Sequence, residues 1–289
     1  MKINTILARL TASLKRRIVN YKSNKFDKFY KLREKQDLIC EIDDIKLKVS
    51  SKSVLAKPLL IKAGFEEAER KIIKGFVKPG MIVFDIGANI GLYTTIMAKQ
   101  AKDEGHVFSF EPYSSTGDYL KYNVSLNELN NVTVEEIALT DTDGRQDFFI
   151  FPEGEDVYNS LGAQKRDVEK TKAEKKIQVQ VSKLDSYCKK NKIEKIDFIK
   201  LDVEGAEEKV FEGGREVFKA MNPIIITEIY ENSAIQCGCS GIRMLKNFSQ
   251  IGYCIYSIDE KSNLTKLTNF EPLNDGTHYI ILSKNEHLS

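Results

Sequence analysis

The chain has 289 residues, of which 42% are hydrophobic, enough to build a sizeable core in one large domain or two small ones. Its five cysteines are scattered, which argues against a disulfide framework and favours a reducing, cytoplasmic compartment. Residues 1–36 carry a net charge of +9 and residues 37–289 one of −7, so the larger part lacks the basic surface of a nucleic-acid-binding protein.

The basic arm formed by residues 1–36 is predicted to contain an amphipathic helix. Its apolar residues recur at steps of three and four, namely Ile3, Ile6, Leu7, Leu10, Leu14 and Ile18. This apolar run is far too short to span a bilayer. Three roles stay open: a helix packed on its own domain or on a sister subunit, a helix lying on a membrane surface, and a frayed tail.

A β-hairpin is predicted at residues 38–50, where hydrophobicity alternates around Asp43-Asp44. We therefore assign residues 1–60 to an arm and hairpin, and residues 61–289 to a cofactor-binding domain.

Strands and helices alternate from about residue 64 onward, which predicts an α/β fold with a mostly parallel sheet. The expected strands are residues 81–86, 106–110, 132–138, 146–151, 177–181, 196–203, 224–229, 253–258 and 277–282. The expected helices are residues 66–76, 92–102, 114–127, 184–191, 206–221 and 241–251. Ligands of such sheets bind beyond the carboxyl ends of the strands.

One strand-to-helix turn has the layout of a nucleotide-type cofactor site. Its sequence is Phe84-Asp-Ile-Gly-Ala-Asn-Ile-Gly-Leu-Tyr-Thr94. A dinucleotide fingerprint with Gly87 in the middle would also have glycine at positions 85 and 90, which hold Asp85 and Ile90. A carboxylate at the mouth of the turn would repel a pyrophosphate. The turn instead favours a cofactor with positive charge and no phosphate, and S-adenosylmethionine fits that description.

Glu111 ends the next strand, in the sequence Phe110-Glu-Pro112, twenty residues after Gly91. A carboxylate at this place can accept hydrogen bonds from both hydroxyls of a ribose. A solvated acid at a strand end is the plain alternative, and the preceding turn favours ribose binding.

A third strand end carries Lys200, Asp202 and Glu204, which are expected to project to one side of a buried strand. A buried Lys is costly unless it is paired, and Asp202, Glu204 or Glu228 are candidate partners. The set is either a structural ion-pair cluster or a polar site that faces a methyl donor and a substrate hydroxyl.

Together these motifs resemble the FkbM-type methyltransferases, a branch of the class I S-adenosylmethionine-dependent fold. The matching pieces are FDIGANIGLYT (84–94), FEP (110–112), Asn123 and Asn127 with Asn131-Val132, Leu184-Asp185, DFIKLDVEGAE (197–207) and Thr227-Glu228. The resemblance covers residues 64–283, and DFIKLDVEGAE is its most specific piece. It implies a Rossmann-like, mostly parallel seven-stranded sheet with helices on both faces.

The resemblance also implies methyl transfer to an oxygen, typically a hydroxyl of a sugar or a natural product. By similarity, the cofactor-binding residues are Asp85, Gly87, Ala88, Asn89 and Gly91 around the methionine part, Glu111 at the ribose and Ala138 beside the adenine. Asp202 and Glu204 would border the reaction site, and Tyr158-Asn-Ser-Leu161 resembles a short family segment near the pocket.

The expected chemistry is in-line displacement at the sulfonium methyl by a substrate hydroxyl, whose proton a base must take. Asp202 is the first choice for that catalytic base, Glu204 is the second, and Lys200 orients or tunes whichever acts. No metal is predicted. In a variant mechanism, a divalent ion bound to Asp202 and Glu228 acidifies the hydroxyl.

Other functions stay open at this stage. The acidic balance of residues 37–289 argues against an RNA ribose 2'-O-methyltransferase. Carboxylates at three strand ends argue against a non-catalytic cofactor-binding interaction module, and Asp85 against an NAD-dependent dehydrogenase. The acceptor, expected to be a small molecule or glycan, would meet the loops at residues 152–176 and 259–276. Peripheral membrane contact through the arm would suit a cytoplasmic enzyme at the inner face of a membrane that assembles such glycans.

Overall fold

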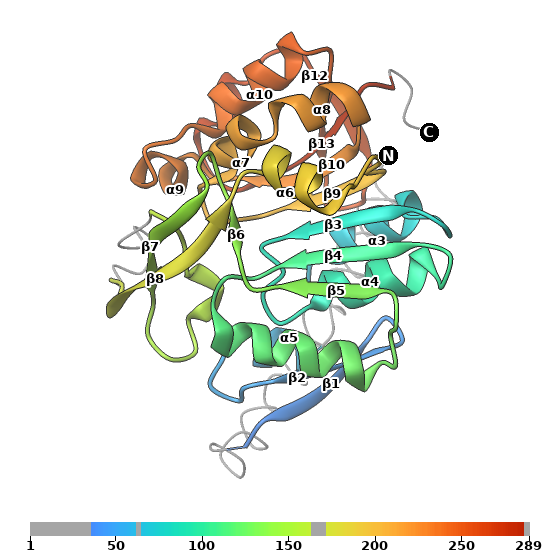
Figure 1. Cartoon of the computed structure of the whole chain (residues 1–289), viewed down its shortest axis with the longest axis vertical. Coiled ribbons are helices and arrows are strands. Elements are labelled where there is room, and N and C mark those ends of the chain that lie inside the picture. Colours follow the sequence, from blue (N-terminus) through green and yellow to red (C-terminus); the bar gives the residue numbers. More distant parts are fainter. Residues whose placement is uncertain (1–35, 62–64, 163–171, 286–289) are drawn as a thin grey trace, which may run out of the picture.

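The computed structural model describes residues 36–61, 65–162 and 172–285, so the helix expected in the arm lies outside the described residues. Within them, the core is an eight-stranded sheet (Figure 1). Its strands lie in the order β12 (Leu264–Leu267), β11 (Cys254–Ile258), β13 (His278–Ser283), β10 (Ile224–Ile229), β9 (Phe198–Leu201), β3 (Ile82–Ile86), β4 (His106–Phe110) and β5 (Val132–Glu135).

The sheet reverses its winding direction between β3 and β9. The chain runs from β3 outward through β4 to β5, and then returns to place β9 and β10 on the other side of β3. These five strands are parallel, whereas β13 is antiparallel to both β10 and β11. In open α/β sheets, ligands bind at the carboxyl ends of the strands beside such a reversal. The expected α/β fold is confirmed.

The expected number of strands was wrong, because the sheet has eight strands rather than seven. The eighth strand, β12, comes from the segment 259–276, which was expected to be a loop. Asp259 accepts hydrogen bonds from the backbone N–H groups of Lys261 and Asn263, and Ser262 adopts a φ of 67°. This tight turn folds a short, half-polar stretch back onto β11 as an edge strand.

Helices cover both faces of the sheet (Figure 1). They are α2 (Ala56–Ile61), α3 (Glu67–Phe76), α4 (Leu92–Ala101), α5 (Ser114–Leu126), α6 (Leu184–Asn191), α7 (Glu207–Gly213), α8 (Arg215–Met221), α9 (Glu231–Gln236) and α10 (Gly241–Gln250), with the 3-10 turns η1 (Asp156–Tyr158) and η2 (Glu271–Asn274). The single helix expected at 206–221 is divided into α7 and α8. A Cβ at Gly213 would lie 1.9 Å from the main-chain oxygen of Thr140, so only glycine allows this close approach.

Alternation along the central strands divides the core into two layers. Val83 and Phe198 face the layer that contains α3 and α4, whereas Phe84 and Ile199 face the layer that contains α6, α7, α8 and α10. By the same alternation, Lys200 lies on the α4 side of the sheet. Lys200 is the next-to-last residue of β9, is buried, and lies beside β3 at the reversal point.

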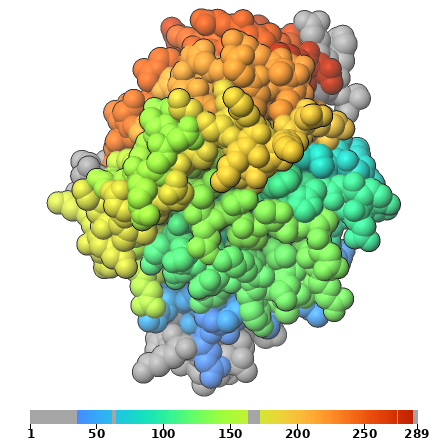
Figure 2. All heavy atoms as spheres, viewed as in Figure 1, coloured from blue at the N-terminus to red at the C-terminus, as the bar shows by residue number. Residues whose placement is uncertain are grey.

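A smaller sheet of three strands lies beside the carboxyl ends of the main one. It contains β6 (Ala138–Leu139), β8 (Lys175–Ser182) and β7 (Gly144–Ile150) in that order. The strand expected at 132–138 is therefore split between the two sheets as β5 and β6. In the space-filling view, the yellow-green residues of this sheet lie at one side of the molecule, between the orange C-terminal helices and the blue hairpin (Figure 2).

The expected hairpin is present as β1 (Leu38–Ile42) and β2 (Ile45–Val49), with Asp43 and Asp44 both at positive φ in the turn. Its buried residues belong to the same hydrophobic cluster as α3 and α4. The boundary between residues 60 and 61 stays a prediction.

Asn123 of α5 and Asn127, which caps its C-terminus, connect the hairpin to the main body. Asn123 accepts a hydrogen bond from the N–H of Lys48 and donates to its carbonyl oxygen, and Asn127 repeats both contacts with Lys46. The buried Asn123 also donates to the carbonyl oxygen of Ile90, at 2.8 Å. One side chain thus joins the hairpin to the turn that follows β3.

No helix in the described part of the chain is long and apolar enough to cross a membrane.

Candidate active site

A cavity of about 600 Å³ opens at the reversal point of the sheet, where β3, β4, β9 and β10 end. Most of the residues that the sequence predicted for the site line it: Gly87, Ala88, Asn89, Glu111, Ala138, Lys200, Asp202, Glu204 and Glu228. Asp85 and Gly91 are not among its lining residues. The three strand ends singled out in the sequence therefore converge on one space.

The N–H groups of the turn after β3 are all used within the protein. Those of Gly87 and Ala88 donate to the carbonyl oxygen of Phe110, and that of Gly91 donates to Ala88. The N–H of Asn89 donates to Glu111, and the side chain of Asn89 accepts from Ile90. In this structure, residues 87–91 thus offer no unused amide to a phosphate, unlike the turns that bind dinucleotides.

Asp85 lies behind the turn rather than at its mouth. It is fully buried, its Oδ2 accepts a hydrogen bond of 2.5 Å from the Thr94 hydroxyl, and it is the register neighbour of Lys200 on β9. Burial raises the pKa of Asp85, although Lys200 and Thr94 partly offset this effect. The repulsion expected between Asp85 and a pyrophosphate is therefore not the feature that selects the cofactor. Its part in cofactor binding stays a prediction.

The two glycines of the turn allow close packing. Gly87 has a φ of 83°, and a Cβ there would lie 1.8 Å from the main-chain oxygen of Asp202. Gly91 has a φ of 89° and is the N-cap residue of α4, where a Cβ would lie 2.5 Å from the side chain of Leu120. Gly91 therefore shapes the turn from outside the cavity.

Glu111 has a buried carboxyl group whose two oxygens are both held in place. Oε2 accepts from the N–H of Asn89, and Oε1 accepts from the N–H of Tyr113, each at 3.0 Å. Burial raises the pKa of Glu111 to about 7, against the opposing effect of these two N–H groups. The carboxyl group is thus oriented toward the cavity and close to its titration point at neutral pH.

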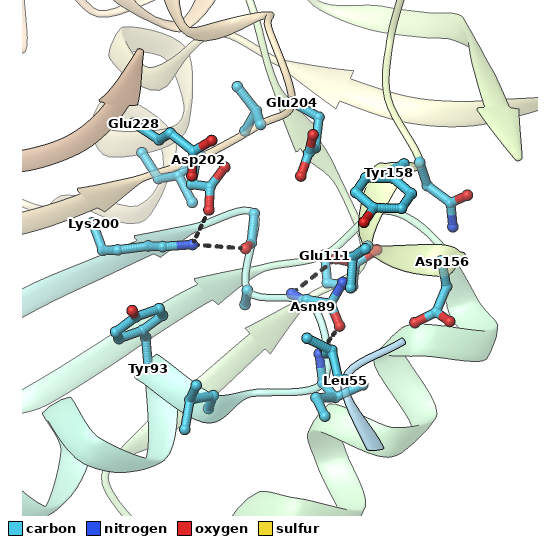
Figure 3. Close-up of a pocket in the computed structure, with 18 of the residues that line it drawn as sticks. Leu55, Asn89, Tyr93, Glu111, Asp156, Tyr158, Lys200, Asp202, Glu204 and Glu228 are labelled. Atoms are coloured by element: carbon cyan, nitrogen blue, oxygen red, sulfur yellow. Dashed lines mark hydrogen bonds and ion pairs between the residues drawn. The ribbon is translucent and has the colours of Figure 1, made fainter. Parts of the chain in front are cut away.

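Lys200 and Asp202 form an ion pair at the end of β9. Lys200 Nζ lies 3.1 Å from Asp202 Oδ2 and 3.4 Å from the carbonyl oxygen of Gly87, and it lies over the ring of Tyr93 (Figure 3). Burial opposes the charge of Lys200, but the carboxylates of Asp202 and Asp85 outweigh it and raise the pKa. Lys200 thus stays charged and connects the turn after β3 to the end of β9.

Glu204 reaches the cavity from a turn rather than from a strand, because β9 ends at Leu201. Glu204 has a φ of 56°, and the N–H groups on either side of it, those of Val203 and Gly205, both donate to Oε1 of the buried Glu207. Burial raises the pKa of Glu207 to about 7. The sequence predicted that Glu204 would continue the alternation of the strand. The structure shows instead that Glu207 holds the turn that carries it.

The sequence did not identify Glu66 and Tyr93 as site residues. Both line the cavity, the Tyr93 hydroxyl donates to Glu66 Oε2 at 2.8 Å, and Glu66 adopts a φ of 45°. A residue other than glycine at positive φ is strained, which is common at functional sites. Glu66 was assigned to the start of a helix, and a single sequence gives no signal that this start faces Lys200.

Glu228, at the end of β10, lies beside Asp202 (Figure 3). Burial raises the pKa of Glu228 to about 8, and the carboxylates of Asp202 and Glu207 add to this effect. Among the described lining residues there are six carboxyl groups and one ammonium group, that of Lys200. The cavity therefore favours a ligand with positive charge and disfavours a phosphate.

Two segments far apart in the chain close one side of the cavity. The N–H of Val54 donates to the carbonyl oxygen of Gly154 at 2.8 Å, and Lys52 pairs with Glu153 at 2.7 Å. Val54, Leu55 and Pro58 line the cavity from the first segment, and Asp156, Val157, Tyr158, Asn159 and Leu161 from the second. Of the segment 259–276, only Gly276 lines the cavity.

Within the described ranges, no group of three or more His, Cys, Asp and Glu side chains is arranged to hold a metal ion. The alternative in which Asp202 and Glu228 share a divalent ion stays untested.

Comparison with protein families gives one match over this site. Residues 85–273 match the model of the methyltransferase FkbM domain. This span is well over half of the chain and includes every strand end described above.

Two relatives support the match. The chain is 28% identical over 158 residues to the 2-O-methyltransferase NoeI of Sinorhizobium fredii, a match that covers 52% of this chain and 64% of NoeI. It is 26% identical over 178 residues to the methyltransferase sdnD of Sordaria araneosa, covering 53% of this chain and 68% of sdnD. The match to NoeI thus covers slightly less than two thirds of that relative.

Among solved structures, a SAM-dependent O-methyltransferase from Thermotoga maritima aligns with a TM-score of 0.39 and 14% identity, covering 77% of this chain and 67% of that one. The TYW2 protein of M. jannaschii, in complex with AdoMet, aligns with a TM-score of 0.43 and 16% identity, covering 86% and 84%.

Proposed function

The chain belongs to the FkbM methyltransferase family, and on this premise we propose that it transfers the methyl group of S-adenosylmethionine to a hydroxyl of a saccharide or a related natural product. The observation that carries the proposal is the convergence of the Gly87 turn, Glu111 and Asp202 on one cavity. These groups suit a donor at one end of the cavity and a hydroxyl at the other.

The chemistry of the cavity fits S-adenosylmethionine. This molecule has a sulfonium and an ammonium group and no phosphate, and the lining has an excess of carboxyl groups and a turn without unused amides. Gly87, Ala88 and Asn89 would hold the methionine part, and the oriented carboxyl group of Glu111 would accept from the ribose hydroxyls. The small side chain of Ala138 leaves room for a flat ring beside it.

The residues at the end of β9 and β10 can handle the proton of the acceptor. When bound, S-adenosylmethionine supplies an electrophilic methyl group. Asp202 would take the proton of the attacking hydroxyl, and its contact with Lys200 through Oδ2 fixes the direction of its carboxyl group. Lys200 also contacts the carbonyl oxygen of Gly87. Lys200 would therefore position Asp202 relative to the turn that holds the methyl donor. Glu204 remains the second candidate for the base.

The lining also supports an uncharged, hydroxyl-rich acceptor. Rings of Tyr158, Tyr230 and Phe151 give flat apolar surfaces, and carboxyl groups beside them can accept hydrogen bonds from hydroxyls. Among the described lining residues, Lys200 has the one ammonium group that could face a phosphodiester, and it is already paired with Asp202. This arrangement argues against the RNA alternative. NoeI is named a 2-O-methyltransferase, in line with transfer to oxygen.

The basic arm adds a proposal about location. A cytoplasmic enzyme whose residues 1–36 lie on an anionic membrane surface would work close to membrane-bound glycan precursors. Co-sedimentation of the full chain and of a variant without residues 1–36 with anionic liposomes tests this point. Equal association of the two proteins would contradict it.

The proposed reaction is tested with S-adenosylmethionine labelled in its methyl group and glycans extracted from cells and fractionated by size and charge. We expect label in a glycan fraction, bound as an ether that resists mild alkali. A parallel incubation with total RNA tests the competing function. Label in RNA and not in glycans would replace the saccharide acceptor with ribose.

A further inference from the structure

The side chain of Asn159 presents a buried hydrogen-bond donor that nothing in the described part of the chain satisfies. Asn159 lines the cavity, and its Nδ2 is buried without a hydrogen-bond partner. A buried unsatisfied donor costs about 1–3 kcal/mol. Such a cost is expected at a position where a ligand supplies the missing acceptor.

The orientation of this amide follows from its neighbours. Asn159 Oδ1 accepts a hydrogen bond of 2.8 Å from the N–H of Phe151, which requires an oxygen at that place and leaves the NH₂ group on the other side. The next residue, Ser160, pairs through both of its backbone groups with Phe149, at 2.8 and 3.2 Å. The backbone that carries the Asn159 donor is therefore held by a short antiparallel pairing with the end of β7.

Asn159 belongs to the Glu111 end of the cavity. Asp156, three residues before it, is close enough to Glu111 to raise the pKa of that group. In Figure 3, Asp156 and Tyr158 lie beside Glu111, whereas Lys200, Asp202 and Glu228 lie on the opposite side. The donor is thus remote from the ion pair at which the acceptor hydroxyl is expected.

The same end of the cavity has apolar walls. Ala138 and Phe148 belong to one hydrophobic cluster, against which Leu161 packs, and all three line the cavity. A flat heteroaromatic ring suits such walls, and the edge of that ring then needs polar partners. Asn159 is placed among these residues with its donor unused.

We propose that Asn159 Nδ2 donates a hydrogen bond to a ring nitrogen of the adenine of S-adenosylmethionine. The inference rests on the proposed function and names a cofactor contact on the segment between β7 and β8. Ring nitrogens of adenine are hydrogen-bond acceptors, and an Asn amide is a common partner of this base. The contact would distinguish adenine from a ring without a nitrogen at that position.

Calorimetry with S-adenosylhomocysteine tests the contact without knowledge of the acceptor. The variant Asn159→Asp keeps an oxygen for the N–H of Phe151 and removes the donor. We expect its affinity for S-adenosylhomocysteine to be roughly tenfold lower, which corresponds to about 1.4 kcal/mol. Thermal unfolding without ligand is measured alongside, and a melting temperature close to that of the original protein shows that the segment keeps its fold.

The 1-deaza, 3-deaza and 7-deaza analogues of S-adenosylhomocysteine separate the hydrogen bond from the added charge of the aspartate. The charge acts on all four ligands alike. For the one analogue that lacks the accepting nitrogen, the additional loss of affinity caused by the missing donor should be absent, to within twofold. An equal loss with all four ligands, or no loss with any, would overturn the inference and leave the proposed function standing. Failure of the original protein to bind S-adenosylhomocysteine would overturn both.

Discussion

The main-chain oxygen of Asp202 lies directly against Gly87, so that a Cβ at residue 87 would come within 1.8 Å of it. The turn proposed to hold the methyl donor and the strand end proposed to hold the base are therefore in contact through their backbones. Lys200 adds a second connection, because its ammonium group touches both Asp202 and the carbonyl oxygen of Gly87. The two halves of the site are thus in contact at two points.

The first prediction follows from that contact. Gly87→Ala should lower the affinity for S-adenosylhomocysteine more than tenfold and destabilise the protein by about 3 kcal/mol, because the methyl group forces the turn away from Asp202. Gly80→Ala is the matched control, since Gly80 has nearly the same φ, 81°, and open space around it. It should cost about 1 kcal/mol and leave binding unchanged. Similar effects of the two variants would show that backbone strain alone is responsible.

The second prediction concerns the attachment of the hairpin. Asn123→Ala should lower the free energy of unfolding by about 3 kcal/mol, because it leaves two partly buried backbone groups of Lys48 and the buried carbonyl oxygen of Ile90 without this partner. Asn127→Ala removes the same pair of contacts at the more exposed Lys46 and should cost about 1 kcal/mol. Urea unfolding measures both. If Asn127→Ala cost as much as Asn123→Ala, the contact with Ile90 would have no special weight.

The third prediction concerns the proposed ribose site. Glu111 has a pKa raised by burial to about 7, and its ionised form is the better acceptor for ribose hydroxyls. The affinity for S-adenosylhomocysteine should therefore rise between pH 6 and pH 8. Glu111→Gln should bind at least tenfold more weakly, with a flatter dependence on pH. A pH-independent affinity of the original protein would contradict this role of Glu111.

The fourth prediction concerns stability and pH. The pKa of Glu207 is about 7 in the folded protein, above its ordinary value of 4.5, so the folded state binds more protons than the unfolded state between these pH values. Its contribution to stability is fully present below pH 4.5 and is lost as the pH rises to about 7, by up to about 1.4 kcal/mol per pH unit.

Glu207→Gln tests this, because it keeps an oxygen for the N–H groups of Val203 and Gly205 but cannot ionise. Relative to the original protein, the variant should gain stability between pH 4.5 and pH 8 in urea unfolding. Glu216→Gln, at an exposed carboxylate, is the control and should follow the original protein. Parallel pH curves for Glu207→Gln and the original protein would show that Glu207 does not titrate in this range.

Much of the site could be predicted because local patterns fix where strands end. Gly87, Glu111 and Asp202 each follow directly or closely after a buried strand, and Lys200 lies within the last residues of one. The ends of parallel strands meet at one edge of a sheet. The direction of a side chain at a strand end is less predictable. Alternation placed Asp85 on the α4 side of the sheet, where it meets Thr94 instead of the cavity.

Contacts between distant segments were the part that a single sequence could not show. Glu66 faces Lys200 only because α3 packs onto α4, and the wall at Val54 exists only because its backbone meets Gly154. The strand β12 was missed for a similar reason, since its half-polar residues become a strand by pairing with β11.

The central claim is methyl transfer from S-adenosylmethionine to a glycan hydroxyl with Asp202 as the base. The most direct measurement is the rate of label transfer to the accepting glycan fraction by the original protein and by Asp202→Asn, with the affinity of each for S-adenosylhomocysteine. We predict transfer by the original protein, and a rate at least about 100-fold lower in the variant with affinity nearly unchanged. Absence of label from every glycan fraction, or an undiminished rate in Asp202→Asn, would contradict the account.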